Sequence, residues 1–368
     1  MNTDTILKKA IRFEPLTLEE GVFIYSHATT GELMMAAHEC RNIQVPGNRV
    51  GWIIDRNINI TNVCISGCKF CNFHCQIDDP RQYITSVSEY ISKIEELTAA
   101  GGNQLLLQGG LHPRLGLSFY ESLFAELKSL FPNLKLHALG PPEIVFLAKK
   151  ERISYREILE KLTESGMDSL PGAGAEILSD RVRQIISPGK CKTDEWLNVM
   201  REAHKMNLVT SATMMFGHIE TLEERVQHLI SLREVQDEKP DGHYGFVTFI
   251  PWPFMDKGTV LESEGIRNRT NANDYIRLVA ISRLMLNNIK NLQASWLTAG
   301  TETASLCLYG GANDFGSVMM EENVVSAAGA NYIMNAEEIQ VAIRNAGFEP
   351  FYRNQAYEPE EFRVNGNA

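Results

Sequence analysis

Short apolar segments that alternate with longer amphipathic ones are the feature that most constrains the fold of this 368-residue chain. We expect strands at Ile53–Val63, Gln104–Gln108, Leu134–Leu139, Ser169–Ala175, Ser211–Phe216, Phe246–Pro251, Leu292–Leu297 and Ala312–Phe315. Helical periodicity separates most of them, at Val87–Ala100, Phe119–Phe131, Tyr155–Ser165, Asp194–Met206, Leu222–Glu238, Ala272–Asn288 and Ala336–Ala346. Eight strands that alternate with helices predict an α/β fold, a (β/α)8 barrel of the TIM type, with a doubly wound open sheet as the alternative.

The first 50 residues are predicted to be helical. Thr17 precedes the amphipathic run LEEGVFIYSHA, and Thr30 starts a second run, GELMMAAHECRNI; threonine is a favoured residue at a helix start. No Ser/Gly-rich linker and no internal repeat divides the chain. We therefore expect an N-terminal helical extension at residues 1–50, the barrel at residues 51–347 and a C-terminal tail at residues 348–368.

The acidic composition limits the partners of this chain. It has 46 Asp and Glu against 35 Lys and Arg, a net charge of −11. Such a surface repels phosphate backbones, so we expect no nucleic-acid partner, although a local pocket can still bind a small anion. No run of about 18 consecutive apolar residues occurs, so we expect no membrane span. The first residues lack the apolar core of a signal peptide, which favours a cytoplasmic location.

A cluster of cysteines is the strongest functional signal. Cys64, Cys68 and Cys71 have the spacing C-x3-C-x2-C and directly follow the first predicted strand. Three thiolates on one loop can each bind one iron of a [4Fe–4S] cluster and leave the fourth iron open for a ligand. The alternatives are a zinc site completed by Cys75 and His74, a fully ligated electron-transfer cluster that uses Cys75, and a group of buried free thiols. Three further cysteines stand alone and are expected to be buried: Cys40, Cys191 and Cys307.

The cysteine loop resembles that of the radical S-adenosylmethionine (SAM) superfamily, whose signature is C-x3-C-x-aromatic-C after the first barrel strand. The resemblance implies that the three cysteines hold the cluster, that SAM binds the open iron, and that Phe70 lies beside the adenine. It further implies that the backbone of Gln108, Gly109 and Gly110 accepts hydrogen bonds from the SAM amino group. A flavodoxin- or ferredoxin-type protein is the expected electron donor.

Polar residues follow several other predicted strands, where βα loops of a barrel carry its chemistry. Glu176 is a candidate for the SAM ribose hydroxyls, or a carboxylate favoured by a helix N-terminus. Trp252 offers a flat face to adenine, or packs in the core. His218 binds a ligand or fixes its own loop, whereas Asp314 and Glu322 are polar groups suited to a sugar-bearing substrate.

Longer segments are similar to the cyclic dehypoxanthine futalosine synthase family of menaquinone biosynthesis. They are LLLQGGLHP, LHALGPPEI, DSLPGAGAEIL, SATMMFGHIET, FIPWPF and GANDFGSVMMEENVVSAAGA, and the resemblance spans residues 13–347. Cys75 is a local departure, and many relatives have Gly at the position of Ala173. Aminofutalosine synthase and the deazaflavin-forming FO synthase share the cluster loop and remain alternatives, as does a noncatalytic iron–sulfur or zinc protein.

The resemblance implies a radical oxidative cyclisation. The 5′-deoxyadenosyl radical takes hydrogen from C4′ of the substrate ribose, and the carbon radical adds to the aromatic ring of the same molecule. Loss of an electron and a proton then restores aromaticity. A group must accept that proton, and the sequence nominates Glu176, His218, Asp314 and Glu322.

Overall fold

The computed structural model describes residues 1–329 and 332–362, and its strands and helices alternate along the chain. The strands are β1 (Arg49–Ile53), β2 (Asp55–Asn59), β3 (Gln104–Gln108), β4 (Lys135–Ala138), β5 (Ser169–Leu170), β6 (Val209–Phe216), β7 (Gly245–Pro253), β8 (Asn291–Leu292), β9 (Asp314–Ser317) and β10 (Glu349–Tyr352). The helices between and after strands β2 to β10 are α4 (Val87–Ala99), α5 (Leu117–Leu130), α6 (Pro141–Glu151), α7 (Tyr155–Glu164), α8 (Asp180–Ile186), α9 (Thr193–Lys205), α10 (Leu222–Asp237), α11 (Val260–Ser263), α12 (Ala272–Met285), α13 (Trp296–Ala299), α14 (Thr301–Tyr309), the 3-10 helix η1 (Ser326–Ala328) and α15 (Ala336–Asn345).

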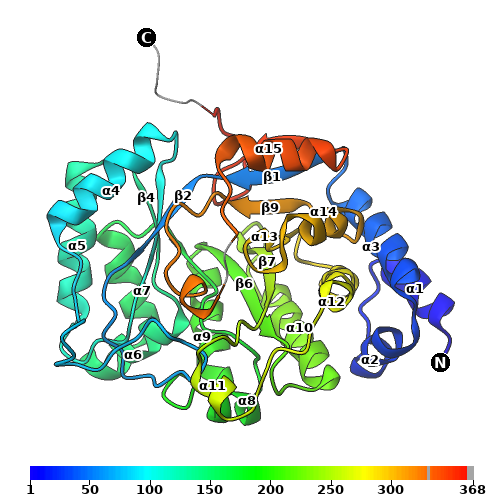
Figure 1. Cartoon of the computed structure of the whole chain (residues 1–368), viewed down its shortest axis with the longest axis horizontal. Coiled ribbons are helices and arrows are strands. Elements are labelled where there is room, and N and C mark those ends of the chain that lie inside the picture. The colour runs from blue at the N-terminus through cyan, green and yellow to red at the C-terminus, as the bar shows by residue number, and fades with distance from the viewer. Residues whose placement is uncertain (330–331, 363–368) are drawn as a thin grey trace.

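Seven strands form a parallel sheet in the order β2-β3-β4-β5-β6-β7-β8, which is also their order in the chain. Each connection therefore runs between neighbouring strands through a helical crossover, as the alternating pattern predicts. Helices α4 to α7 lie along one flank of the strands and α10 and α12 along the other (Figure 1). The predicted parallel α/β architecture is confirmed.

A second parallel sheet has the order β10-β1-β9. Strand β1 runs on into β2 after Ile54, and a bridge between Gln293 and Asp314 joins the end of β8 to β9. The strands thus follow one another round from β2 to β9, but their ladders are divided between two sheets. This arrangement brings all the strand ends that carry the predicted site toward one interior.

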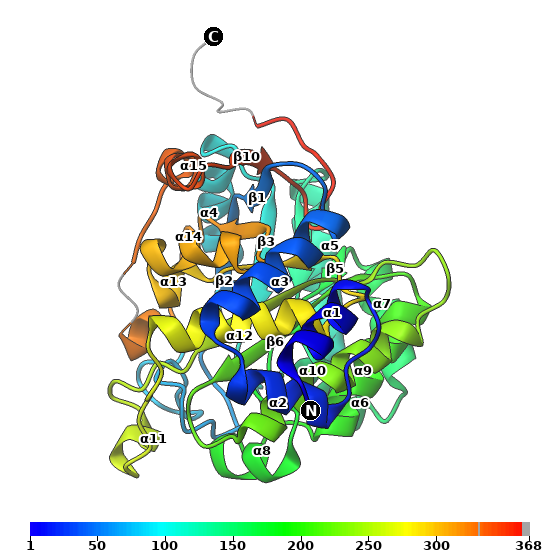
Figure 2. The ribbon, with the colours of Figure 1, turned by 90° about the vertical axis from the view of Figure 1, so that its right-hand side faces the viewer.

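Three helices precede the strands: α1 (Thr3–Ile11), α2 (Leu18–His27) and α3 (Thr30–Gln44). They lie on the outside of the strand region, where α2 contacts α10 and α3 contacts α12 (Figure 2). Thr17 caps α2 as predicted, through a reciprocal pair with Glu20. Helix α3 begins at Thr30 as predicted, and its cap is the preceding Thr29, which pairs in the same way with Glu32.

The structure differs from the predicted boundaries of three strands. The strand expected at Ile53–Val63 begins earlier and ends at Asn59, and only the first two residues of Ser169–Ala175 are a strand. Within Leu292–Leu297 the chain leaves the sheet after Leu292, and Trp296 starts helix α13. The first two segments are almost wholly buried, so no alternation of apolar and polar residues marks where their strands stop. In the third, apolar and polar residues go on alternating as far as Trp296, past the end of the strand.

The C-terminal part of the described chain returns to the sheet. Within the range expected to be a tail, 348–368, strand β10 pairs with β1 and Arg353 is 3% exposed. Residues 363–368 of that range, and Ala330 at the end of the last quoted motif, lie outside the described residues. None of the helices in the described ranges is long and apolar enough to cross a membrane.

Candidate active site

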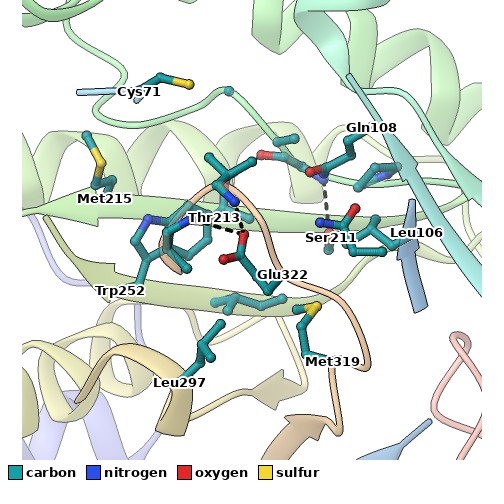
Figure 3. A pocket seen from close by; sticks show the side chains of 18 of the residues that line it. Cys71, Leu106, Gln108, Ser211, Thr213, Met215, Trp252, Leu297, Met319 and Glu322 are labelled. Atoms are coloured by element: carbon teal, nitrogen blue, oxygen red, sulfur yellow. Dashed lines mark hydrogen bonds between the residues drawn. The ribbon is translucent and has the colours of Figure 1, made fainter. Parts of the chain in front are cut away.

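A cavity of about 370 Å³ opens inside the strands and reaches the cysteine loop. Trp252 and Met215 lie on one side and Gln108 and Ser211 on the other, with Glu322 between them (Figure 3). The predicted residues that line it are Cys64, Phe70, Cys68, Cys71, Gln108, Gly109, Gly110, Glu176, Trp252 and Glu322. These predicted residues come from five separate strand ends and loops, which therefore meet in one space.

The cysteine loop surrounds two of its sulfur atoms with hydrogen-bonding groups. Cys64 and Cys68 are buried and Cys71 is partly exposed. The Leu111 backbone N–H donates to Cys64 Sγ at 3.2 Å, and Ser66 Oγ lies 2.9 Å from Cys64 Sγ and 3.3 Å from Cys68 Sγ. Burial raises the pKa of the Cys68 thiol to about 11, so this sulfur becomes a thiolate only when a cation compensates its charge. These donors fit an iron–sulfur cluster.

The same cysteines do not fit a single metal ion. No three His, Cys, Asp or Glu side chains in residues 1–329 and 332–362 converge closely enough to hold one. Ligands of a [4Fe–4S] cluster need no such convergence, because each thiolate binds a different iron. Cys75 pairs through its backbone with Val63 and Asn62, and its side chain is 4% exposed. The donor arrangement therefore supports a three-cysteine cluster over zinc.

Close packing of Gly110 against the cysteine loop gives a first prediction. A Cβ there would sit 2.8 Å from Cys64 Cβ and closer still to the Val63 carbonyl oxygen. We expect Gly110→Ala to lower stability by about 1–3 kcal/mol and to reduce the iron content, because the loop must move away. Urea unfolding and iron analysis measure both effects. Gly31→Ala, where no atom lies within 4 Å of the added methyl, is the control and should retain both.

Glu176 is held by a lysine that the sequence analysis missed. Lys190 Nζ donates to Glu176 Oε1 at 2.6 Å and lies 5.1 Å from the centre of the Phe70 ring. The Gly189 N–H donates to the Ser66 carbonyl oxygen at 3.0 Å, which brings Lys190 beside the cysteine loop. Nearby Cys68 and Glu176 raise the pKa of Lys190 despite its burial. The pair presents a fixed, neutralised carboxylate to the cavity.

Two predicted residues in the described chain do not line the cavity. His218 is wholly buried, with Nδ1 3.0 Å from Glu220 Oε2 and Nε2 3.1 Å from the Met215 carbonyl oxygen. Asp314 is also wholly buried and forms a bidentate ion pair with Arg353, at 2.5 and 2.8 Å. Arg353 itself does line the cavity. The sequence pattern placed Asp314 near the site but gave no sign of its partner.

Glu322 does line the cavity, but its carboxylate already has backbone partners. Its oxygens accept the N–H groups of Val324, Val325 and Ser326, at 2.9, 3.1 and 2.8 Å. This cap holds the turn that leads into η1. A further carboxylate, Glu143 at the start of α6, lines the cavity as well and was not singled out by the sequence analysis. Its only local signal was the position after the strand in LHALGPPEI.

Comparisons with known proteins identify the superfamily of this chain. Residues 58–232 match the radical SAM superfamily, and residues 243–365 match the CofH/MqnC C-terminal region. A Streptomyces coelicolor protein named cyclic dehypoxanthine futalosine synthase is 38% identical over 358 residues, 96% of this chain and 88% of the relative. A Methanothermobacter thermautotrophicus protein named 5-amino-6-(D-ribitylamino)uracil–L-tyrosine 4-hydroxyphenyl transferase is 38% identical over 96% of this chain and 97% of its own length.

The fold also matches a solved structure. The crystal structure of methylornithine synthase superposes with a TM-score of 0.71 over 95% of this chain and 98% of that chain, at 21% identity. The chain belongs to the radical SAM superfamily, and its second part to the CofH/MqnC group. It is therefore an enzyme of a family that uses a [4Fe–4S] cluster and SAM, and Cys64, Cys68 and Cys71 provide the cysteine motif.

Proposed function

We propose that this enzyme converts dehypoxanthine futalosine to cyclic dehypoxanthine futalosine in menaquinone biosynthesis. The observation that carries the proposal is the similarity to the Streptomyces coelicolor synthase, which is 38% identical over 96% of the chain. When bound, the cluster and SAM would supply the radical chemistry that removes hydrogen from C4′ of the substrate ribose. The reaction is an intramolecular addition, so the protein must hold sugar and arene in contact and exclude water.

Residues of this chain have distinct tasks in the proposal. Cys64, Cys68 and Cys71 hold three irons, and the backbone at Gln108, Gly109 and Gly110 receives the SAM amino group. Phe70 and Trp252 provide flat faces for adenine. Glu176, fixed by Lys190, accepts hydrogen bonds from the SAM ribose hydroxyls. A flavodoxin- or ferredoxin-type protein delivers the electron.

A second function is supported by the equal identity of the Methanothermobacter relative. That reaction would join a fragment of tyrosine to 5-amino-6-(D-ribitylamino)uracil. It needs two substrates in the cavity together with SAM, whereas the cyclisation needs one. The two functions are therefore separable by supplying each substrate set to the same preparation.

The test is an anaerobic incubation of reconstituted enzyme with SAM, a reductant and dehypoxanthine futalosine, followed by mass spectrometry. We expect a product that has lost two hydrogens, together with 5′-deoxyadenosine. A parallel reaction with tyrosine and 5-amino-6-(D-ribitylamino)uracil should give no coupled product. Coupling in the second reaction, or 5′-deoxyadenosine without cyclised product in the first, would contradict the proposal. Cys71→Ala is the matched inactive control.

A further inference from the structure

The cyclisation needs a proton acceptor, and the four residues that the sequence nominates are all engaged elsewhere. Glu176 is paired with Lys190, and Asp314 with Arg353. His218 is held between Glu220 and a backbone carbonyl and lies outside the cavity lining, and Glu322 accepts three backbone N–H groups. A carboxylate that is paired with a cation, or that accepts three backbone N–H groups, is stabilised in its charged form and is a poor base. A different group must therefore accept the proton.

In the described part of the chain, Glu143 is a cavity-lining carboxylate without a cationic partner. It is 8% exposed and belongs to the first turn of α6, directly after strand β4. Within the described residues no Lys, Arg or His comes within ion-pair distance of its carboxylate. The two residues before it are Pro141 and Pro142, which have no N–H. The two prolines therefore remove two of the donors at the helix start, and the N–H groups of Gly140 and Glu143 remain.

The surroundings of Glu143 make it a stronger base than an ordinary glutamate. Burial is the largest effect and raises its pKa to about 7, against smaller lowering effects from the backbone N–H groups of Glu143 and Gly140 and from the charge of Lys190. Two other titratable groups lie close enough for the charge of Glu143 to raise their pKa: Tyr120 on α5 and Cys191 after α8. A base whose pKa lies near the working pH is suited to proton transfer.

We propose that Glu143 is a catalytic residue that accepts the proton released when the substrate ring regains its aromaticity. This inference rests on the proposed function. After the C4′ radical adds to the ring, the ring carbon that was attacked carries both the new C–C bond and its original hydrogen. That C–H bond breaks, its proton goes to the Glu143 carboxylate and its two electrons return to the ring. One electron leaves the ring for a one-electron acceptor of the iron–sulfur class, which completes the balance.

The test compares Glu143→Gln with wild type, using substrate deuterated at C4′. We expect the yield of cyclic product to fall about 100-fold or more, since general base catalysis is worth that much. Deuterium should still appear in 5′-deoxyadenosine, because the hydrogen transfer precedes the proton transfer. Glu143→Asp, which keeps a carboxylate, should recover part of the product. Glu126→Gln, at an exposed position on the neighbouring helix α5, is the matched control and should behave as wild type.

A second measurement does not depend on turnover. Infrared difference spectra of wild type should show a buried carboxyl band that disappears as the pH rises, with a midpoint near 7. The band should be absent from Glu143→Gln, while its iron content stays at the wild-type value. Wild-type product yield from Glu143→Gln would overturn the inference, and so would loss of deuterium transfer. Wild type that forms no cyclic product would instead overturn the proposed function.

Discussion

Cys71→Ala is expected to purify without an intact cluster, whereas Cys75→Ala should retain it. Cys71 is partly exposed on the loop that carries Cys64 and Cys68, and it faces the same cavity. Its removal leaves two thiolates, which cannot hold a [4Fe–4S] cluster that has one open iron. Cys75 is fixed by backbone contacts to Asn62 and Cys64 rather than by its sulfur. Removing its sulfur should therefore cost only local packing.

The measurement is iron and sulfide analysis, with low-temperature electron paramagnetic resonance of the reduced protein, after anaerobic reconstitution. We expect Cys71→Ala to lose SAM cleavage by at least about 100-fold, in line with the loss of an essential group. Cys75→Ala serves as the control for cysteine removal on the same loop. Loss of the cluster from Cys75→Ala would support the alternative of four protein ligands. A full cluster in Cys71→Ala would contradict the three-cysteine assignment.

Arg353→Met is expected to destabilise the protein by about 3–5 kcal/mol, because it leaves Asp314 as an unpaired buried charge. Both side chains are nearly inaccessible, at 3% and 0% exposure. The Arg353 guanidinium also lies over the Tyr357 ring, 3.9 Å from its centre. The pair joins β9 to the segment after β10, so its loss should also loosen the C-terminal part of the chain. Asp314→Asn should also destabilise the protein, because it leaves Arg353 without its buried partner.

A double-mutant cycle separates this structural role from a catalytic one. The variant with both Asp314→Asn and Arg353→Met should be less destabilised than the sum of the single changes, because neither charge is then left alone. Thermal and urea unfolding of the reconstituted enzyme measure the coupling. A structural role for Asp314 predicts that the rate of hydrogen transfer to 5′-deoxyadenosine, per molecule of folded enzyme, stays the same in each variant. Additive stability effects, or a rate lost at unchanged stability, would contradict the structural assignment.

The sequence predicted the parts of this protein that depend on local pattern. Alternating periodicities identified the parallel α/β architecture, and strand β3 has the predicted bounds, Gln104–Gln108. The spacing of Cys64, Cys68 and Cys71 identified the cluster loop, because three ligands on one short loop are brought together by the loop itself. The Gly-rich and polar strand ends were also predicted to meet, since the carboxyl ends of parallel strands share one edge.

Only the tertiary structure decided which polar groups reach the cavity and which of their charges are neutralised by an ion pair. Lys190 pairs with Glu176 across 14 residues of chain, and Arg353 pairs with Asp314 across 39. No local pattern encodes such contacts, so the sequence left Glu176, His218, Asp314 and Glu322 as equal candidates. Among the described residues Glu143 is buried without an ion pair, whereas Glu176 and Asp314 are buried and paired with a cation. These differences are set by neighbours in space. Periodicity and motif spacing thus determined the scaffold and the cysteine ligands, whereas the ionic state of the site arises from long-range packing.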